Sequence, residues 1–263
     1  MLIGRDTKAL VTGASRGIGL ATARLLGGRG AKVGMLARSE EELSRRAEEV
    51  EGAVPVVGDV GDRDSVAAAV GRFAEEAGGI DLVVANAGLA HYGPFADQPI
   101  EHAEQMVRVN VLGVIYTVSA TLPHLLDQAR GHVVVVSSAA GLRAFPWAAV
   151  YGATKAADRG FAEALRHELS GTGVSVSTVL PGEIATSLHD HQRERLPDWR
   201  ASADEGLPPE RVAEGILAAV EEDRRQVHVP GSVRMLGLNA LAPRLVDRVL
   251  RAARGGSAAP RRD

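Results

Sequence analysis

The chain has 263 residues, of which 45% are hydrophobic, and this is enough to bury a large core in one domain or two small ones. Basic and acidic residues number 30 and 33, which excludes the strongly basic footprint of a nucleic-acid-binding protein. The absence of cysteine excludes disulfides, thiolate catalysis and cysteine-ligated metal, and we predict no metal site. We expect a cytoplasmic protein, because no apolar signal segment is visible and no apolar stretch approaches about 18 residues.

Short apolar runs alternate with helical patterns along most of the chain. The runs predict buried strands at Lys8–Thr12, Lys32–Leu36, Val54–Val57, Leu82–Ala85, His132–Val136 and Val174–Leu180. Segments with helical periodicity predict helices at Gly17–Gly28, Glu40–Val50, Asp62–Ala77 and Tyr151–Ser170. This alternation predicts an α/β fold: a doubly wound, Rossmann-like parallel sheet of about seven strands, with helices on both faces, in a single domain over residues 1–254.

Two regions break the alternation. Residues 183–208 are polar and charged, lack clear periodicity and are interrupted by prolines, so we expect a lid segment there. Near the end of the chain, apolar residues at helical spacing among arginines predict an amphipathic helix over about 238–254, followed by a tail over 255–263. Packing of this helix on the domain or on another subunit is favoured over association with a membrane surface.

A glycine-rich turn follows the first predicted strand, over residues 12–19. Gly13 permits a tight turn, Gly17 leaves room for backbone beside a phosphate, and Gly19 lets helix and strand pack closely. The helix N-terminus would hold a pyrophosphate through its unpaired N–H groups. A turn that binds nothing is the alternative, but the position at the first strand–helix junction favours a dinucleotide. The same turn contributes Ser15, Arg16 and Ile18.

The end of the second predicted strand bears on the choice of dinucleotide. An acidic residue there would bind the ribose 2′-hydroxyl of NAD. This chain has Ala37-Arg38-Ser39 instead, and Arg16 supplies a second cation. Two guanidinium groups and a hydroxyl suit a 2′-phosphate, so NADP(H) is favoured and NAD(H) is the alternative. Arg38 could also be a solvated residue at the start of a helix.

Tyr151 and Lys155 are four residues apart, and Ser138 lies thirteen residues before the tyrosine. The chain has three tyrosines and only three lysines among its 30 basic residues, so the pair is rare by chance. On a helix the two side chains would share one face, and the ammonium would favour the phenolate form of the tyrosine. A surface contact between the two side chains is the alternative.

Taken together, these motifs resemble the short-chain dehydrogenase/reductase family in its single-domain form. The resemblance runs from about Thr7 to Pro230 and adds Asn86-Ala87-Gly88, Asn110 and Pro181-Gly182 in the family's order. Ala85 departs from it, since many relatives carry an asparagine there. The resemblance implies that Ser138, Tyr151 and Lys155 are catalytic, and that the backbone of Asn110 holds a water that relays protons to Lys155.

The resemblance also implies further dinucleotide contacts. Asp59 would accept a hydrogen bond from the adenine amine, although Asp59 and Asn86 could instead only form local turns. Lys155 would hydrogen-bond the nicotinamide ribose. The expected contacts beyond the glycine turn are Arg38, Ser39, Asp59, Val60, Asn86, Ala87, Gly88, Tyr151, Lys155, Pro181, Gly182, Ile184 and Thr186.

The function implied is the NADP(H)-dependent interconversion of a carbonyl and an alcohol by hydride transfer, with Tyr151 as general acid or base and Ser138 holding the carbonyl oxygen. An NAD(H)-dependent dehydrogenase and a non-catalytic dinucleotide sensor are the alternatives. Substrate would be read by residues 91–95, 142–147 and 183–208, with Phe95, Phe145, Trp147 and Trp199 offering apolar surface. Helices around 100–128 and 150–170 would pair subunits into a homodimer or homotetramer.

Overall fold

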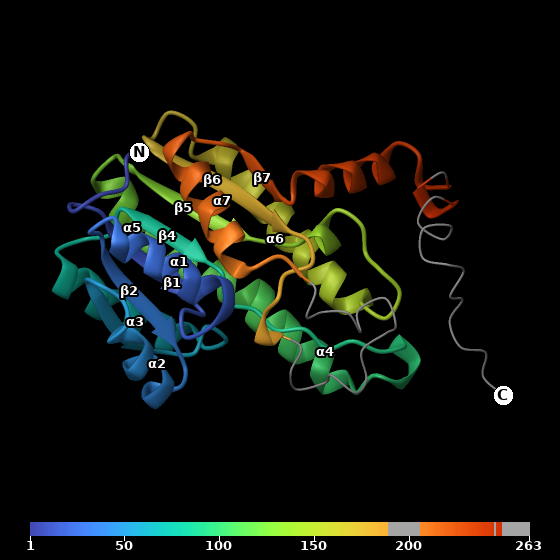
Figure 1. The fold of residues 1–263 in the computed structure, drawn as a ribbon, viewed down its shortest axis with the longest axis horizontal. Helices are drawn as coiled ribbons and strands as arrows, with labels where there is room; N and C mark the ends of the chain where they lie inside the picture. Colours follow the sequence, from blue (N-terminus) through green and yellow to red (C-terminus); the bar gives the residue numbers. More distant parts are fainter. Residues whose placement is uncertain (189–205, 245, 249–263) are drawn as a thin grey trace.

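A computed structural model of the protein describes residues 1–188, 206–244 and 246–248. Seven strands form one fully parallel sheet in the order β3-β2-β1-β4-β5-β6-β7 (Figure 1). The strands are β1 (Lys8–Thr12), β2 (Lys32–Ala37), β3 (Ala53–Val57), β4 (Leu82–Ala85), β5 (Gly131–Val136), β6 (Val174–Pro181) and β7 (Gln226–Val229). The predicted fold class and the six predicted strands are confirmed, with ends that differ by at most one residue.

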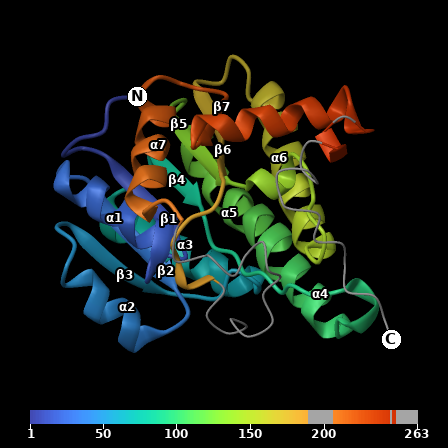
Figure 2. The same ribbon diagram turned by 45° about the vertical axis from the view of Figure 1, so that its right-hand side comes forward.

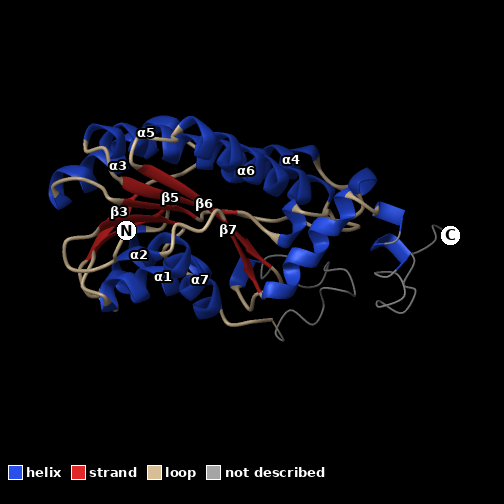
Figure 3. Ribbon diagram, turned by 90° about the horizontal axis from the view of Figure 1, so that it is seen from above, coloured by secondary structure: helices blue, strands red, loops and turns tan. Residues whose placement is uncertain are grey.

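Helices cover both faces of the sheet (Figure 3). One face carries α1 (Gly17–Gly28), α2 (Glu40–Ala47) and α7 (Pro209–Glu221). The other carries α3 (Arg63–Ala77), α5 (Gly113–Asp127) and α6 (Ala149–Glu168). The short helix α4 (Ile100–Met106) runs through a π-helical segment, η2 (Val107–Leu112), into α5. The described part also contains the 3₁₀ segments η1 (Phe95–Asp97), η3 (Ala139–Gly141) and η7 (Gly231–Ala240).

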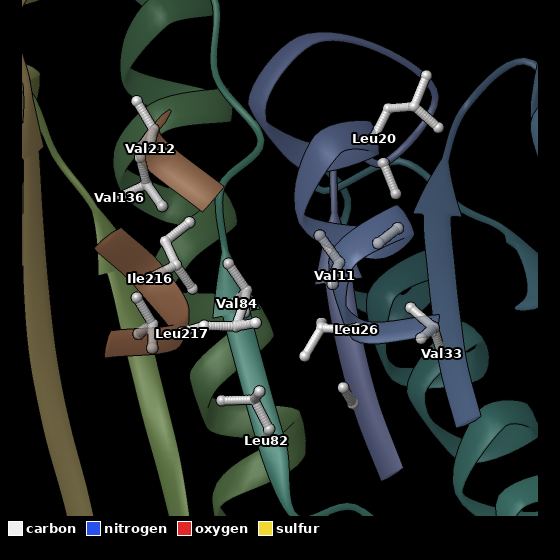
Figure 4. Close-up of a cluster of buried hydrophobic side chains, with 14 of the residues drawn as sticks. Val11, Leu20, Leu26, Val33, Leu82, Val84, Val136, Val212, Ile216 and Leu217 are labelled. Carbon is white, nitrogen blue, oxygen red and sulfur yellow. The ribbon is translucent and has the colours of Figure 1, made fainter. Parts of the chain in front are cut away.

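Each face of the sheet has its own hydrophobic core. Alternate residues of the central strands pack with α1 and α7 on one side, where Val11, Leu26 and Ile216 are fully buried (Figure 4). The remaining strand residues pack with α3, α5 and α6 on the other side, around Phe73 and Leu125. Near-continuous apolar strands are the consequence of burial on both faces, which is why the sequence shows runs rather than alternation.

The helix predicted over Asp62–Ala77 begins one residue later, at Arg63, and the helix predicted over Tyr151–Ser170 is observed at Ala149–Glu168. Two further predicted ends differ for reasons that the structure shows. The helix predicted to reach Val50 ends at Ala47, because the amides of Glu49 and Val50 turn to carbonyls three residues back, and these tighter bonds end the α-helix. The helix predicted from about residue 238 does not start there. The 3₁₀ segment η7 occupies the chain to Ala240, and helical structure resumes only at Pro243.

The continuous helix over Ile100–Asp127 bears on the expectation that no apolar stretch is long enough to span a membrane. It is long and apolar enough to cross a bilayer by length and composition, with a mean hydropathy of 1.5 over its best window. A helix around 100–128 was expected, but its apolar length was not, because polar residues such as Asn110, Thr117 and His124 interrupt the apolar run. Core helices of water-soluble proteins have the same length and composition, so these two properties argue only weakly for a membrane span. This helix packs Val114, Val118 and Leu125 into the core shared with α3 and the sheet.

The site is positioned by the point at which the strand order reverses. After β1 the chain adds β2 and β3 on one side of β1, and then returns to place β4 on the other side. The loops that follow β1 and β4 therefore diverge and leave a crevice at the carboxyl ends of the strands.

Candidate active site

A cavity of about 770 Å³ lies at the carboxyl ends of the strands. It collects most of the residues that the sequence predicts for the site, from segments spread over more than half of the chain. Those lining it are Gly13, Ser15, Arg16, Gly17, Ile18, Arg38, Ser39, Asp59, Val60, Asn86, Ala87, Gly88, Ser138, Tyr151, Lys155, Pro181, Gly182, Ile184 and Thr186. Among the residues predicted for catalysis or dinucleotide binding, Gly19 and Asn110 do not line it.

The glycine turn has the geometry that its sequence predicts. Gly13 and Gly17 have φ values of +66° and +55°, where side chains are strained. A Cβ on Gly19 would lie 2.2 Å from the Gly13 carbonyl oxygen, so Gly19 serves close packing rather than the cavity surface. No side chain caps the N-terminus of α1, unlike α2 and α3, which Ser39 and Asp62 cap. The first N–H groups of α1 are therefore available to an anion.

Two cations and one carboxylate line the cavity in the turns that follow β1 and β2. Arg16 and Arg38 are exposed and line the cavity, and within the described residues neither takes part in a salt bridge. Ser39 uses its hydroxyl to accept the Glu42 amide at 3.4 Å, which caps α2. Glu42, which the sequence analysis did not single out, also lines the cavity. The region therefore combines two unpaired guanidinium groups with a nearby carboxylate.

Asp59 makes the local turn that was the alternative to ligand binding, whereas the side chain of Asn86 makes a long-range contact. Asp59 Oδ1 accepts the amide of Gly61 at 2.9 Å. Asn86 Nδ2 donates to the Thr12 carbonyl at 2.9 Å and ties the end of β4 to the end of β1. Both residues nevertheless border the cavity, so each positions the loop that it belongs to beside the open space.

Tyr151 and Lys155 lie on one face of α6 and are buried at the cavity wall, with exposures of 8% and 4%. The Lys155 ammonium donates to the Val136 carbonyl at 3.0 Å and to Asp158 Oδ2 at 2.9 Å. Burial alone would lower the pKa of Lys155, but the charge of Asp158 and then that of Tyr151 outweigh it and raise this pKa above its ordinary value. Lys155 is thus held as a cation beside the phenol.

Ser138 and Asn110 have different surroundings from those of the tyrosine and lysine. Ser138 lines the cavity just beyond β5, and its Oγ accepts the Ala140 amide at 3.1 Å, which leaves its O–H free to donate. Asn110 is fully buried in η2. Its side chain bonds both backbone groups of Leu89 at 2.9 Å and donates to Thr154 Oγ1 at 3.0 Å, so it clamps the loop after β4 to α6.

Residues that sequence reasoning missed hold α6 against the end of β5. Ser137 Oγ donates to the Lys155 carbonyl at 2.7 Å. A Cβ on Gly141 would lie 2.6 Å from the same carbonyl oxygen, and a Cβ on Gly152 would lie 2.8 Å from the Cβ of Ala144. These close approaches fix where Tyr151 and Lys155 face the cavity. Their only trace in the sequence is glycine or serine near a catalytic motif, which is too common to be informative.

The far end of the cavity is apolar. Tyr92, Phe145, Leu188, Val233 and Leu236 line it, and the ring centroids of Tyr92 and Tyr151 are 5.9 Å apart. η7 follows β7 along the chain (Figure 2). Its residue Val233 packs with Leu180 and Ala139.

The predicted substrate contacts are only partly correct. Phe145 lines the cavity, but Phe95 points to solvent at 63% exposure and Trp147 does not border the cavity, because η1 and the left-handed backbone of Trp147 turn them away. Tyr92, which lies in the predicted segment 91–95, does line the cavity, whereas Val233 and Leu236 lie outside the predicted segments and carry no motif. Trp199 and most of the predicted lid lie outside the described residues. The described ends of that segment pair through Ile184 and Leu207.

The model of the short-chain dehydrogenase family matches residues 7–197, which is well over half of the chain and includes the glycine turn and the Tyr151–Lys155 pair. The chain belongs to this family. As a short-chain dehydrogenase it is an oxidoreductase, and the resemblance read from its motifs is confirmed.

Similar proteins agree with the family. An uncharacterized oxidoreductase of Staphylococcus saprophyticus is 33% identical over 223 residues, covering 83% of this chain and 92% of the relative. One of Listeria monocytogenes is 34% identical over 222 residues, covering 81% of this chain and 90% of the relative. The short-chain dehydrogenases thus include relatives whose names state oxidoreduction without a substrate.

Solved structures of the family share the fold. A short-chain dehydrogenase/reductase from Burkholderia phymatum, in complex with NAD, has a TM-score of 0.86 at 25% identity and covers 94% of this chain and 97% of its own. A 3-ketoacyl-(acyl-carrier-protein) reductase from Brucella melitensis, with NADH, has 0.78 at 27% identity, with 85% and 96% covered. An alcohol dehydrogenase from Thermococcus sibiricus, with 5-hydroxy-NADP, has 0.73 at 30% identity, with 84% and 95% covered.

Proposed function

We propose that this oxidoreductase interconverts a carbonyl and an alcohol with NADP(H), and that Tyr151 is the general acid and base. The observation that carries the proposal is that one cavity holds both the uncapped N-terminus of α1 and the buried Tyr151–Lys155 pair. The first suits a pyrophosphate and the second suits proton exchange. A dinucleotide-sensing protein would need only the first of these.

The chain's own residues divide the work in this proposal. Gly13, Gly17 and the first amides of α1 hold the pyrophosphate, and the bound nicotinamide supplies or accepts the hydride. Tyr151 gives a proton to the carbonyl oxygen in reduction and takes it back in alcohol oxidation. Ser138 donates a hydrogen bond to that oxygen, and Lys155 provides the positive charge that favours the phenolate. We also propose that Lys155 contacts the nicotinamide ribose.

NADP(H) is the proposed dinucleotide because Arg16 and Arg38 both line the cavity, exposed and without salt-bridge partners among the described residues. One observation favours NAD(H) as the second candidate. Glu42 lines the same end of the cavity, where a carboxylate can accept a hydrogen bond from a ribose 2′-hydroxyl and repels a 2′-phosphate. The dinucleotides named for the similar structures include both kinds.

The apolar end of the cavity supports a small to medium organic substrate, with the carbonyl at Ser138 and Tyr151 and the apolar part against Phe145 and Leu236. We propose assembly into a homodimer or homotetramer through the α4–α5 helix, on which Ile100, Val107 and Ile115 are exposed. Sedimentation of the purified chain tests the assembly, and a monomer at micromolar concentration contradicts it.

The activity is tested by a substrate screen. Purified protein is mixed with ketones and aldehydes plus NADPH or NADH, and with alcohols plus the oxidised dinucleotides, while the absorbance of the reduced dinucleotide is followed. We expect turnover of apolar carbonyl compounds, with NADPH preferred. Dinucleotide binding without any turnover across the panel would favour the sensor, and failure to bind either dinucleotide would overturn the proposal.

A further inference from the structure

A buried carboxylate lies directly behind the proposed catalytic lysine. Asp158 follows Lys155 by three residues on α6, and its Oδ2 accepts a hydrogen bond from the lysine ammonium at 2.9 Å. The side chains are 1% and 5% exposed. Asp158 does not line the cavity, so it can act on a ligand only through Lys155.

The carboxylate is incompletely satisfied. Asp158 Oδ1 is buried and has no hydrogen-bond partner among the described residues. A buried ion pair is commonly no more stable than an apolar pair of the same size, so fold stability gives little reason for a half-satisfied carboxylate in this place. Burial also raises the pKa of the Asp158 carboxyl, against the opposing charge of Lys155. Costly buried charges of this kind are concentrated at functional sites.

Lys155 has few other electrostatic partners. α6 packs against β5, β6, η2, η3 and α4. β5 meets the ammonium with the neutral carbonyl of Val136, and η2 contributes the neutral amide of Asn110 to the same region. The charges that act on Lys155 in the described part of the chain are those of Asp158 and Tyr151, both on α6.

We infer that Asp158 is a positioning residue: its carboxylate keeps the Lys155 ammonium charged and anchored at the end of β5, and thereby sets the pH range over which Tyr151 exchanges protons. The part of this inference that concerns Tyr151 rests on the proposed function. The part that concerns Lys155 stands on the contacts alone.

Removal of the Asp158 charge should lower the pH at which Lys155 and Tyr151 each lose a proton. Without the carboxylate, the buried ammonium loses its counter-ion, and desolvation makes Lys155 give up its proton at a lower pH. While Lys155 remains protonated, removal of the negative charge of Asp158 leaves the ammonium as the charge beside the phenol, so proton loss from Tyr151 becomes easier. Both limbs of a pH–activity profile therefore move to lower pH when Asp158 is neutralised.

The variant Asp158→Asn tests the inference with little change in shape. The chain has only three lysines, so lysine labelled with ¹³C at Cε gives three NMR signals, and Lys155→Arg identifies the signal of Lys155 by its loss. We expect the titration midpoint of Lys155 to fall by about one to three pH units in Asp158→Asn. An unchanged midpoint would overturn the inference.

Asp81→Asn is the matched control. Asp81 is also a buried carboxylate, held by the Lys8 amide at 3.0 Å and by Arg130 at 3.1 Å, but it lies at the start of β4, at the opposite end of the sheet from the cavity. This substitution should lower stability without moving the Lys155 midpoint. A general loosening of the fold would move the midpoint in both variants, and that result also contradicts the inference.

Two further measurements keep the test decisive. If Asp158→Asn does not fold, the wild-type midpoint of Lys155 is measured instead; a value below the ordinary lysine value of about 10.4 contradicts an anchoring counter-ion. The pH profile of kcat/KM in Asp158→Asn should shift downward on both limbs, while that of Asp81→Asn stays in place. If the wild type has no turnover at all, the proposed function fails, and the NMR titration still decides the Lys155–Asp158 contact.

Discussion

The two ends of the cavity differ in the groups that line them, which are mainly backbone at one end and mainly side chains at the other. The end at β1 and β2 is made mainly of backbone: positive-φ glycines and the free amides of α1, with exposed arginines at its rim. The end at β5 and α6 is made of buried side chains, in which Tyr151, Lys155 and Asp158 act on one another. Binding of a polyanion can rely on fixed dipoles, whereas proton exchange needs a charge whose surroundings are controlled. We therefore expect the two ends to respond differently to substitution.

The largest expected effect is at the buried end. Lys155→Met leaves Asp158 as a buried charge without a partner, which should lower the free energy of unfolding by about 3–5 kcal/mol. The double variant Lys155→Met/Asp158→Leu removes both charges and should recover most of that stability, but not turnover. Urea unfolding of the three proteins measures the difference. Equal stability of the single variant and the wild type would show that the pair is not a coupled buried unit.

Acid sensitivity of the fold should come from outside the cavity. His132 is buried at the amino end of β5, with Nε2 2.8 Å from Ser177 Oγ. Burial lowers its pKa to about 4, although Asp223 partly opposes this. The unfolded chain then binds more protons as pH falls from about 6.5 to about 4, so stability is lost in that window, by about 3 kcal/mol in total.

The variant His132→Asn cannot titrate in this range, and its free energy of unfolding should depend less steeply on pH than that of the wild type. Urea unfolding at several pH values measures both slopes. If the two slopes are the same, His132 is not the source of acid sensitivity.

At the backbone end of the cavity, one added methyl group on α1 should lower stability and dinucleotide affinity at Gly19 but not at Gly28. Gly19→Ala places a Cβ against the Gly13 carbonyl, and we expect a loss of about 1–3 kcal/mol in stability together with weaker dinucleotide binding. Gly28→Ala is the control in the same helix, because nothing lies within 4 Å of its added Cβ. Thermal melts with and without NADPH compare the two variants. Gly19→Ala with the stability and affinity of the control would show that the turn tolerates an added methyl group.

The smallest expected effect is on dinucleotide preference, at the exposed residues on the rim of the cavity. Arg38→Ala should raise the KM for NADPH by about tenfold, roughly the strength of one charge-assisted contact, and change the KM for NADH little. Arg45→Ala, an exposed arginine of α2 farther along the helix, serves as the control. Glu42→Gln should shift preference the other way, toward NADPH. Equal changes for both dinucleotides in Arg38→Ala would mean that Arg38 does not read the 2′-phosphate.

The backbone end could be predicted from the sequence almost completely. Gly13, Gly17 and Gly19 mark their conformations and close approaches locally, and the apolar runs fix the strands. β7 was not among the predicted runs, because it is a four-residue edge strand with polar Gln226 and His228.

At the buried end of the cavity, only the motif residues Ser138, Tyr151 and Lys155 could be predicted from the sequence. Asp158 is a charged residue in a helical pattern, and nothing in the sequence says that it faces inward. The clamp made by Asn110 and the contact of Ser137 with the Lys155 carbonyl depend on how η2 and β5 pack against α6. Long-range packing of this kind leaves no local signal. Phe95 and Trp147 were wrongly placed in the pocket for the same reason.

The most direct test of the central claim is a comparison of Tyr151→Phe with the wild type on the best substrate of the screen. The substitution removes one hydroxyl and keeps the ring that packs near Tyr92. Fluorescence titration with NADPH and initial rates are measured on the same preparations. We predict an unchanged dissociation constant for NADPH and a loss of turnover of about 10² to 10⁴-fold. Turnover within a few-fold of the wild type would contradict the assignment of Tyr151 as the proton donor.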